Sequence, residues 1–192
     1  MWHRLYQWTM AWSGSPQALP ALFWISFIEA SVFPIPPYLL LIPMVLANPQ
    51  RGWQFAFWGS IGSVLGGVAG YVIGWQFWDI IGRPLMEQSG RMEMYESLRQ
   101  QFDRYDAWII LMTALSPIPY KIFTITAGVM QASLPLFIFA SLVARSLRFF
   151  GMAMLVMWGG RPALAWLERH GRWLAWVGLL VLIAIISWVF LK

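Results

Sequence analysis

Long stretches without a charged residue constrain this chain more strongly than any other feature of its sequence. Residues 53–78 and 173–191 contain no Asp, Glu, Lys or Arg, and an α-helix needs about 20 apolar residues to cross a bilayer. Only 11% of the 192 residues are charged and 59% are hydrophobic, whereas soluble domains carry about 25% charged residues. We therefore expect one all-α, polytopic integral membrane domain over residues 1–192.

Several function classes are excluded by residues that the chain lacks. It has no Cys, which removes thiol catalysis and Cys-ligated metal sites. Its only His, His3 and His170, are far apart in sequence, so we expect no metal and no cofactor. No membrane-level Asp pair or His-containing nucleophile motif is present, so we expect a transporter-like protein and no enzyme. The net charge of +5 fits topology and lipid headgroup contacts, not nucleic acid.

Apolar and charged segments divide the domain. The expected elements are a first hairpin over 17–48, a transmembrane span over 53–81, a charged extramembrane segment over 82–106, a second hairpin over 107–131, and spans over 135–158 and 173–191. In the charged segment the spacing predicts helical ion pairs between Glu87 and Arg91 and between Glu96 and Arg99. Lys and Arg are balanced between the two sides, so the orientation stays open.

Prolines interrupt both predicted hairpins. An interior proline removes a helical hydrogen bond and clashes with the preceding turn. The arms on either side of the first break have about 15 and 11 residues and would be roughly 22 and 16 Å long, too short for a ~30 Å hydrocarbon core. We therefore expect re-entrant hairpins, with a single kinked span as the alternative for the first. The predicted breaks lie at Pro34, Pro36 and Pro37 and at Pro117 and Pro119.

The two hairpins belong to an internal repeat. The same tripeptide, Pro-Ile-Pro, begins at Pro34 and at Pro117, and an apolar arm, a short turn and a full span follow each copy. Because a hairpin plus one span changes the side of the membrane, the second copy must be inverted relative to the first. Inverted repeats with broken helices are the architecture of secondary transporters.

A ridge of glycines runs along the span 53–81. The glycines recur every four positions, which places them on one helical face where another backbone can approach closely. Packing within the chain is the favoured interpretation, and a lipid path or a contact between copies in a homo-oligomer stays open. The ridge consists of Gly62, Gly66, Gly70 and Gly74.

Four ionisable residues lie in segments that we place in the bilayer: Glu29, Lys121, Arg145 and Arg148. Each costs several kcal/mol if it faces lipid, so the hairpins are expected to bring them together in the interior. One acid against three bases leaves a positive excess that an anionic, phosphate-bearing substrate would satisfy. Two alternatives stay open: Glu29 carries a proton, or it forms a structural ion pair while the other cations reach the headgroups.

The order of these motifs resembles the DedA family, also called the VTT or SNARE-associated-Golgi-protein family, especially its YqaA-like branch. The motifs are Glu29 before Phe33-Pro34-Ile35-Pro36-Pro37, then Gly66-Gly67-x-x-Gly70-Tyr71, Pro117-x-Pro119, Thr126-Ala127-Gly128-Val129-Met130 and Arg145-Ser146-Leu147-Arg148-Phe149. The resemblance implies a multi-pass protein of the bacterial inner membrane with two opposed re-entrant hairpins.

The resemblance also implies a role in moving lipids between leaflets, with proton coupling in some members. Glu29 matches the family's acidic residue in the first hairpin, and Gly128 matches the small residue after the second break. The chain departs from the Arg-Phe-x-Pro-x-x-Arg pattern of many members, because Leu115 replaces its first arginine and Lys121 its second. Arg145 and Arg148 could supply the missing positive charge.

Together with the positive excess, the resemblance implies a flippase- or scramblase-type translocase for a phospholipid or polyprenyl phosphate. Its partners would be membrane lipids with anionic headgroups, and protons if transport is coupled to them. Half-helix N-termini after the proline breaks would add hydrogen-bond donors for the phosphate. The alternative function is a membrane scaffold or assembly factor that binds another membrane protein through the glycine ridge.

Overall fold

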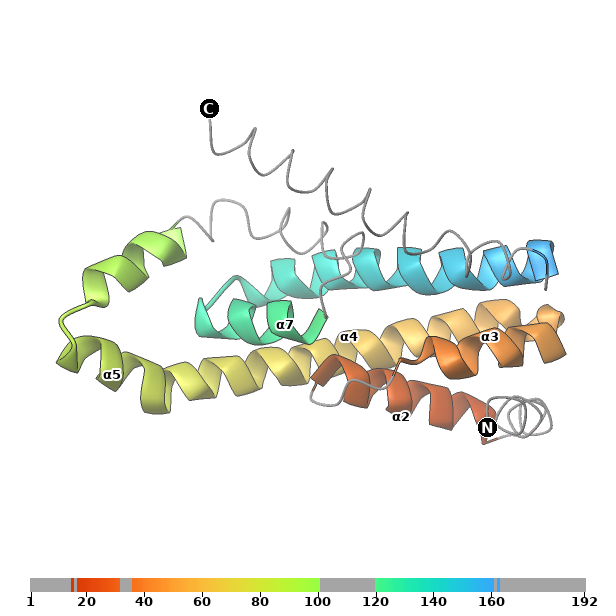
Figure 1. Ribbon diagram of the computed structural model, residues 1–192, viewed down its shortest axis with the longest axis horizontal. Coiled ribbons are helices and arrows are strands. Elements are labelled where there is room, and N and C mark those ends of the chain that lie inside the picture. The colour runs from red at the N-terminus through yellow and green to blue at the C-terminus, as the bar shows by residue number, and fades with distance from the viewer. Residues whose placement is uncertain (1–14, 16, 32–35, 101–119, 161, 163–192) are drawn as a thin grey trace, which may run out of the picture.

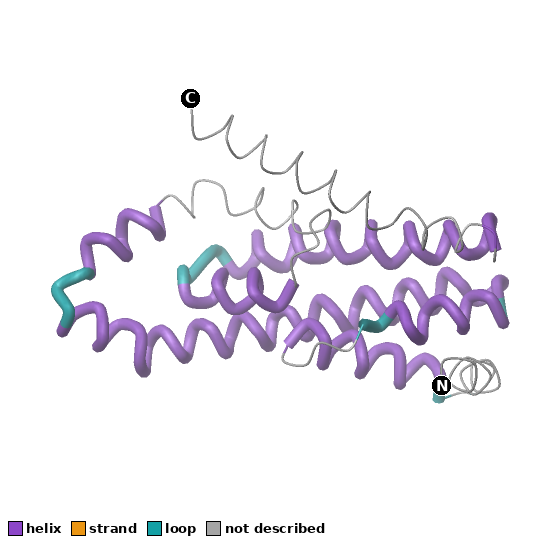
Figure 2. Tube along the Cα trace, viewed as in Figure 1, coloured by secondary structure: helices purple, strands orange, loops and turns teal. Residues whose placement is uncertain are grey.

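The computed structural model describes residues 15, 17–31, 36–100, 120–160 and 162. This part of the chain consists of helices joined by short turns and has no strand (Figure 2). The prediction of an all-α fold is therefore confirmed for the described residues. Several predicted features lie outside them, namely Pro34, Pro117, Pro119, the first arm of the second hairpin and the span 173–191.

A continuous helical rod, Pro49–Gln88, is the central element of the fold (Figure 1). It begins with a 3-10 turn, Pro49–Arg51, and continues as α4, Gly52–Phe77, a π-helical turn, Trp78–Gly82, and α5, Arg83–Gln88. Its 40 residues would be about 60 Å long. The rod contains the predicted span 53–81 and extends beyond it into the charged segment.

The first apolar segment forms two short helices separated by a break. α2, Ala18–Ser31, has 14 residues, and α3, Tyr38–Ala47, has 10, so they are about 21 and 15 Å long. They run in opposite directions in Figure 1. The described end of the break contains Pro36 and Pro37, so an interruption occurs where the prolines predict it.

A second helix pair follows the charged segment. α7, Tyr120–Val129, is joined by a tight turn to a long helix, Leu134–Gly160, drawn in blue in Figure 1. In the turn Gln131 has a positive φ of 54°, and the N–H of Ala132 bonds the carbonyl of Ala127 at 3.0 Å. Figure 1 shows α7 and α3 running in opposite directions beside α4.

The glycine ridge of α4 is the surface on which α2 and α7 pack. A Cβ atom at Gly66 would overlap the carbonyl oxygen of Phe27 in α2, and one at Gly74 would overlap that of Ile125 in α7. Small residues allow this close backbone approach. The ridge is therefore occupied within the chain, and all four of its glycines are buried: Gly62, Gly66, Gly70 and Gly74.

Gly128 makes the reciprocal contact from α7. A Cβ atom at this position would overlap the carbonyl oxygen of Tyr71 in α4. The hydroxyl of Tyr71 in turn donates to the carbonyl of Ala132 at 2.6 Å. These contacts fix the end of α7 and the following turn against α4.

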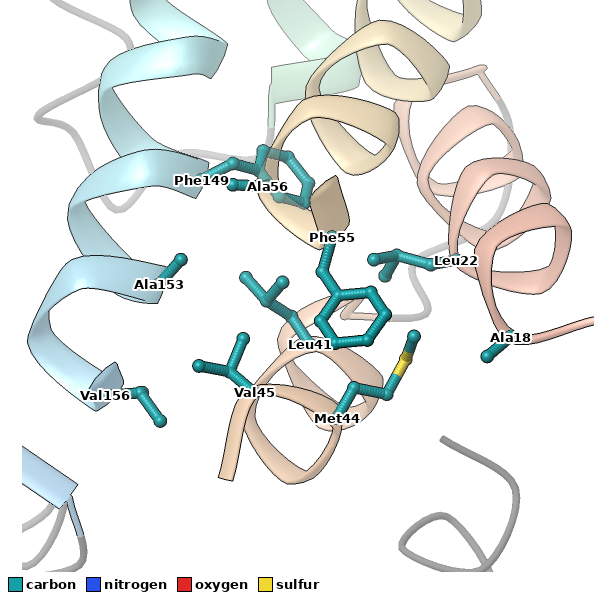
Figure 3. Close-up of a cluster of buried hydrophobic side chains, with 10 residues drawn as sticks. All are labelled: Ala18, Leu22, Leu41, Met44, Val45, Phe55, Ala56, Phe149, Ala153 and Val156. Atoms are coloured by element: carbon teal, nitrogen blue, oxygen red, sulfur yellow. The ribbon is translucent and has the colours of Figure 1, made fainter. Parts of the chain in front are cut away.

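An apolar cluster joins the first helix pair to the two long helices (Figure 3). Phe55 of α4 lies at its centre, between Leu22 of α2 and Leu41 of α3. Residues of the Leu134–Gly160 helix close the cluster on the other side. Its buried members are Ala18, Leu22, Leu41, Met44, Val45, Phe55, Ala56, Phe149, Ala153 and Val156.

The charged segment folds back toward the end of α7. Its second helix, 92–100, presents Tyr95, whose ring stacks on Trp78 at 3.6 Å and whose hydroxyl donates to the carbonyl of Val129 at 2.9 Å. The predicted ion pair of Glu87 with Arg91 is wrong, because α5 ends at Gln88 and Glu87 pairs with Arg83 at 2.9 Å.

The predicted pair of Glu96 with Arg99 is also absent from the ion pairs of the described residues. Exposed pairs of this kind contribute little to stability.

Two described helices, Pro49–Gln88 and Leu134–Gly160, are long and apolar enough to cross a membrane. The second exposes large apolar side chains along its length, including Phe139 at 66% and Trp158 at 78% exposure. Soluble monomers rarely expose contiguous apolar surface of this kind, so the surface is suited to lipid.

We expect Gly66→Ala to lower the stability of the protein by about 1–3 kcal/mol, the usual cost of overpacking a filled interior, because the new methyl group would displace α2. The midpoint of thermal unfolding in detergent measures this change. Gly151→Ala is the matched control, since nothing lies within 4 Å of its Cβ position and alanine is the better helix former. Equal midpoints for the two variants would contradict the close approach of α2 to α4.

Candidate functional site

A buried ion pair connects α2 to the Leu134–Gly160 helix. Nη2 of Arg145 donates to Oε2 of Glu29 at 2.8 Å. The side chains of Arg145 and Glu29 are 4% and 20% exposed. Among the described residues this is the only ion pair between separate elements, because the other, Arg83 with Glu87, lies within α5.

Burial makes each charge of the pair dependent on the other. Removing one partner of a buried pair leaves an uncompensated charge and typically costs 3–5 kcal/mol. In a membrane the penalty for an unpaired charge is also several kcal/mol. The contact therefore holds α2 and the long helix together.

Aromatic rings enclose the guanidinium of Arg145. Its Cζ atom lies 4.6 Å from the ring centroid of Tyr120 and 5.4 Å from that of Phe149. Both distances are within the range of cation–π attraction. Because Tyr120 is the first residue of α7, the start of α7 meets the ion pair.

Arg148 lies one helical turn further along the same helix and contacts α3. Its Cζ atom is 5.6 Å from the ring centroid of Tyr38, and the Tyr38 ring lies 5.4 Å from that of Phe149. Arg148 is partly exposed. Rings and cations therefore form a connected row in the order Tyr120, Arg145, Phe149, Tyr38 and Arg148.

Two of the four predicted charges, Glu29 and Arg145, are in direct contact, and Arg148 lies beside them. Lys121 follows Tyr120 at the start of α7 and is partly buried, and its carbonyl accepts the hydroxyl of Thr124 at 2.9 Å. No group of three His, Asp or Glu residues that could hold a metal occurs in the described part of the chain.

The predicted donors at the start of α3 are partly occupied. The N–H groups of Leu39 and Leu40 bond back to the carbonyls of Pro36 and Pro37 at 3.2 and 3.1 Å. Tight turns of this type commonly satisfy the free N–H groups of a helix start. Side chains are therefore the main donors on the α3 side of the site.

The sequence analysis missed the aromatic residues of the site. Tyr38 and Tyr120 each directly follow a proline in the sequence and are the first residues of α3 and α7, a shared position that could have identified them. Phe149 directly follows Arg148, but its sequence position alone does not indicate which rings or charges it contacts.

The family model for the VTT domain matches residues 33–157, which is more than half of the chain. The match includes α3, α4 and α7, together with Arg145 and Arg148. The chain belongs to the VTT-domain family. The predicted resemblance is thereby confirmed. Proteins of the VTT-domain family are membrane proteins commonly linked to membrane transport.

Two relatives of this VTT-domain protein come from bacteria. A protein of Haemophilus influenzae is 37% identical over 188 residues, which cover 98% of this chain and 96% of the relative. A protein of Histophilus somni is also 37% identical over 188 residues, covering 98% and 97% of the two chains. Both are described as uncharacterized proteins. No solved structure matches the chain.

Within this VTT-domain fold we expect Arg145→Met to be far more destabilising than Arg148→Met. The first substitution leaves Glu29 without its ion-pair partner, at a cost of about 3–5 kcal/mol, whereas the second removes a partly exposed cation from a ring face, worth about 0.5–2 kcal/mol. Denaturant titration in mixed micelles measures both. The prediction fails if Arg148→Met costs as much as Arg145→Met.

Proposed function

We propose that this VTT-domain protein moves a lipid with a phosphate headgroup between the two leaflets, without covalent chemistry. The observation that carries the proposal is the excess of cations at the buried site. Arg145 bonds the single carboxylate, Glu29, and Arg148 lies one helical turn away over the ring of Tyr38. Both guanidinium groups match phosphate oxygens in shape and charge. The anionic headgroup would supply the missing negative charge.

The depth of the site supports this function. Arg145 and Arg148 lie near the middle of Leu134–Gly160, so the ends of that helix are roughly 16 to 23 Å away from them. A Cβ atom at Gly67, near the middle of Gly52–Phe77, would lie 2.7 Å from the hydroxyl of Tyr120. If both helices span the bilayer, the charges lie near its midplane, where a lipid headgroup must pass.

We infer that α2 and α3 form one re-entrant hairpin and that α7 belongs to a second, inverted one. α2, α3 and α7 are too short to cross a ~30 Å core, and α3 and α7 run in opposite directions in Figure 1. The end of α2 and the start of α7 approach each other at the ion pair. Binding at the meeting point of two inverted repeats is the general design of secondary transporters.

Exchange of ion-pair partners gives a simple transport step. The phosphate competes with Glu29 for the guanidinium of Arg145, and the released carboxylate takes up a proton or remains exposed to water that enters with the headgroup. The acyl chains stay in the bilayer beside the exposed apolar faces of the long helices. Return of Glu29 to Arg145 then releases the headgroup to the opposite leaflet.

The bacterial relatives support location in a bacterial inner membrane. The scaffold function has weaker support, because its proposed binding surface, the glycine ridge, is filled by α2 and α7 of the same chain.

Reconstituted liposomes test the proposal. Fluorescent phosphatidic acid and a polyprenyl phosphate are placed in one leaflet, and their appearance in the other is followed for the wild type, Glu29→Gln and Arg145→Gln. We expect movement by the wild type and at least a tenfold lower rate in both variants. Glu87→Gln is the matched control, because its carboxylate belongs to an exposed pair away from the site.

Folded wild-type protein that moves neither lipid would refute the translocase function. Equal losses in Glu87→Gln and Glu29→Gln would show that the site between the hairpins has no special role in transport.

A further inference from the structure

Three buried hydrogen-bond donors around the ion pair lack a partner among the described residues. They are Nε of Arg145 and the hydroxyl groups of Tyr38 and Tyr120. Buried polar groups are nearly always hydrogen-bonded, and an unsatisfied one costs about 1–3 kcal/mol. Three such groups at one site therefore indicate that a ligand or solvent completes it.

The side chains that carry the three groups form one connected cluster beside the ion pair. The rings of Tyr120 and Tyr38 are linked through Arg145 and Phe149 by contacts of 4.6, 5.4 and 5.4 Å. The buried hydroxyl of Ser141 lies beside that of Tyr120 and can donate to it, which leaves the Tyr120 O–H without an acceptor. The donors thus belong to one site and not to separate parts of the bundle.

The chemistry of the donors indicates the ligand. A guanidinium N–H can only donate, and the carboxylate of Glu29 is already bonded to Nη2 of Arg145. The phenol hydroxyls lie beside two cations, so a hydrogen bond that they donate to an anionic acceptor is more favourable than contact with a further donor. A phosphate group offers several acceptor oxygens and the negative charge that two arginines and one carboxylate require.

We propose that the hydroxyls of Tyr38 and Tyr120 donate to phosphate oxygens of the lipid headgroup, together with Nε of Arg145. The two tyrosines are then specificity-determining residues, which favour a phosphate-bearing lipid over an uncharged one. This inference rests on the proposed function, whose site it completes. It assigns one tyrosine to each helix that begins after a proline break.

Tyrosine-to-phenylalanine variants test this role, because they keep the rings that contact Arg145, Arg148 and Phe149. The wild type, Tyr38→Phe and Tyr120→Phe are titrated in detergent with short-chain phosphatidic acid, and the bound fraction is measured by native mass spectrometry. Each variant should raise the Kd by about five- to twentyfold. Binding of the corresponding diacylglycerol, which lacks the phosphate, should not change.

Tyr71→Phe is the matched control. Its hydroxyl bonds the carbonyl of Ala132 and not the site, so the substitution should lower thermal stability while the Kd for phosphatidic acid stays at the wild-type value. Competition by inorganic phosphate identifies the source of the ligand. Competition at low concentrations would indicate free phosphate, whereas competition only at high concentrations would indicate a lipid headgroup.

The binding assay separates this inference from the translocase function. Loss of affinity in the two variants would support the phosphate site even if the wild type moves no lipid in liposomes. Unchanged Kd values in both variants would overturn it, and so would a wild type that does not bind phosphatidic acid or a Tyr71→Phe variant that loses as much affinity as they do.

Discussion

A carboxylate and a guanidinium that are largely buried among apolar helices are stable only if they meet. Glu29 and Arg145 satisfy this constraint with a contact of 2.8 Å, and the positions of four helices follow from it. The pair brings the end of α2 to the middle of the Leu134–Gly160 helix. The start of α7 covers the guanidinium from one side through Tyr120, and α3 reaches the neighbouring turn through Tyr38.

The glycine ridge makes this meeting possible. Because Gly66 and Gly74 have no side chain, α2 and α7 can lie directly on the backbone of α4. α2 and α7 then share one face of α4, and the end of α2 and the start of α7 lie at the charged site. The glycine contacts that pack α2 and α7 on α4 therefore also position the charged site. Tyr38 and Tyr120, at the starts of α3 and α7, lie beside that site.

Much of this arrangement was predictable from sequence, since it depends on chemical constraints that are visible in the residues. Prolines predicted the break before Tyr38, glycine spacing predicted close helix packing, and the cost of charge in a bilayer predicted that Glu29 would meet an arginine. Which arginine it meets was not predictable, because Arg145 and Arg148 share a helical face and only the tertiary register distinguishes them. The aromatic enclosure was missed for the same reason, since many rings in this chain are exposed and do not enter a site.

The central claim is that Glu29 and Arg145 stabilise the protein as a pair. A double-mutant cycle tests it most directly, with free energies of unfolding in mixed micelles measured for the wild type, Glu29→Gln, Arg145→Gln and the double variant. The account predicts that the double variant loses less stability than the sum of the single variants, with a coupling energy of about 1 kcal/mol or more. Additive losses would contradict the ion pair and the site built around it.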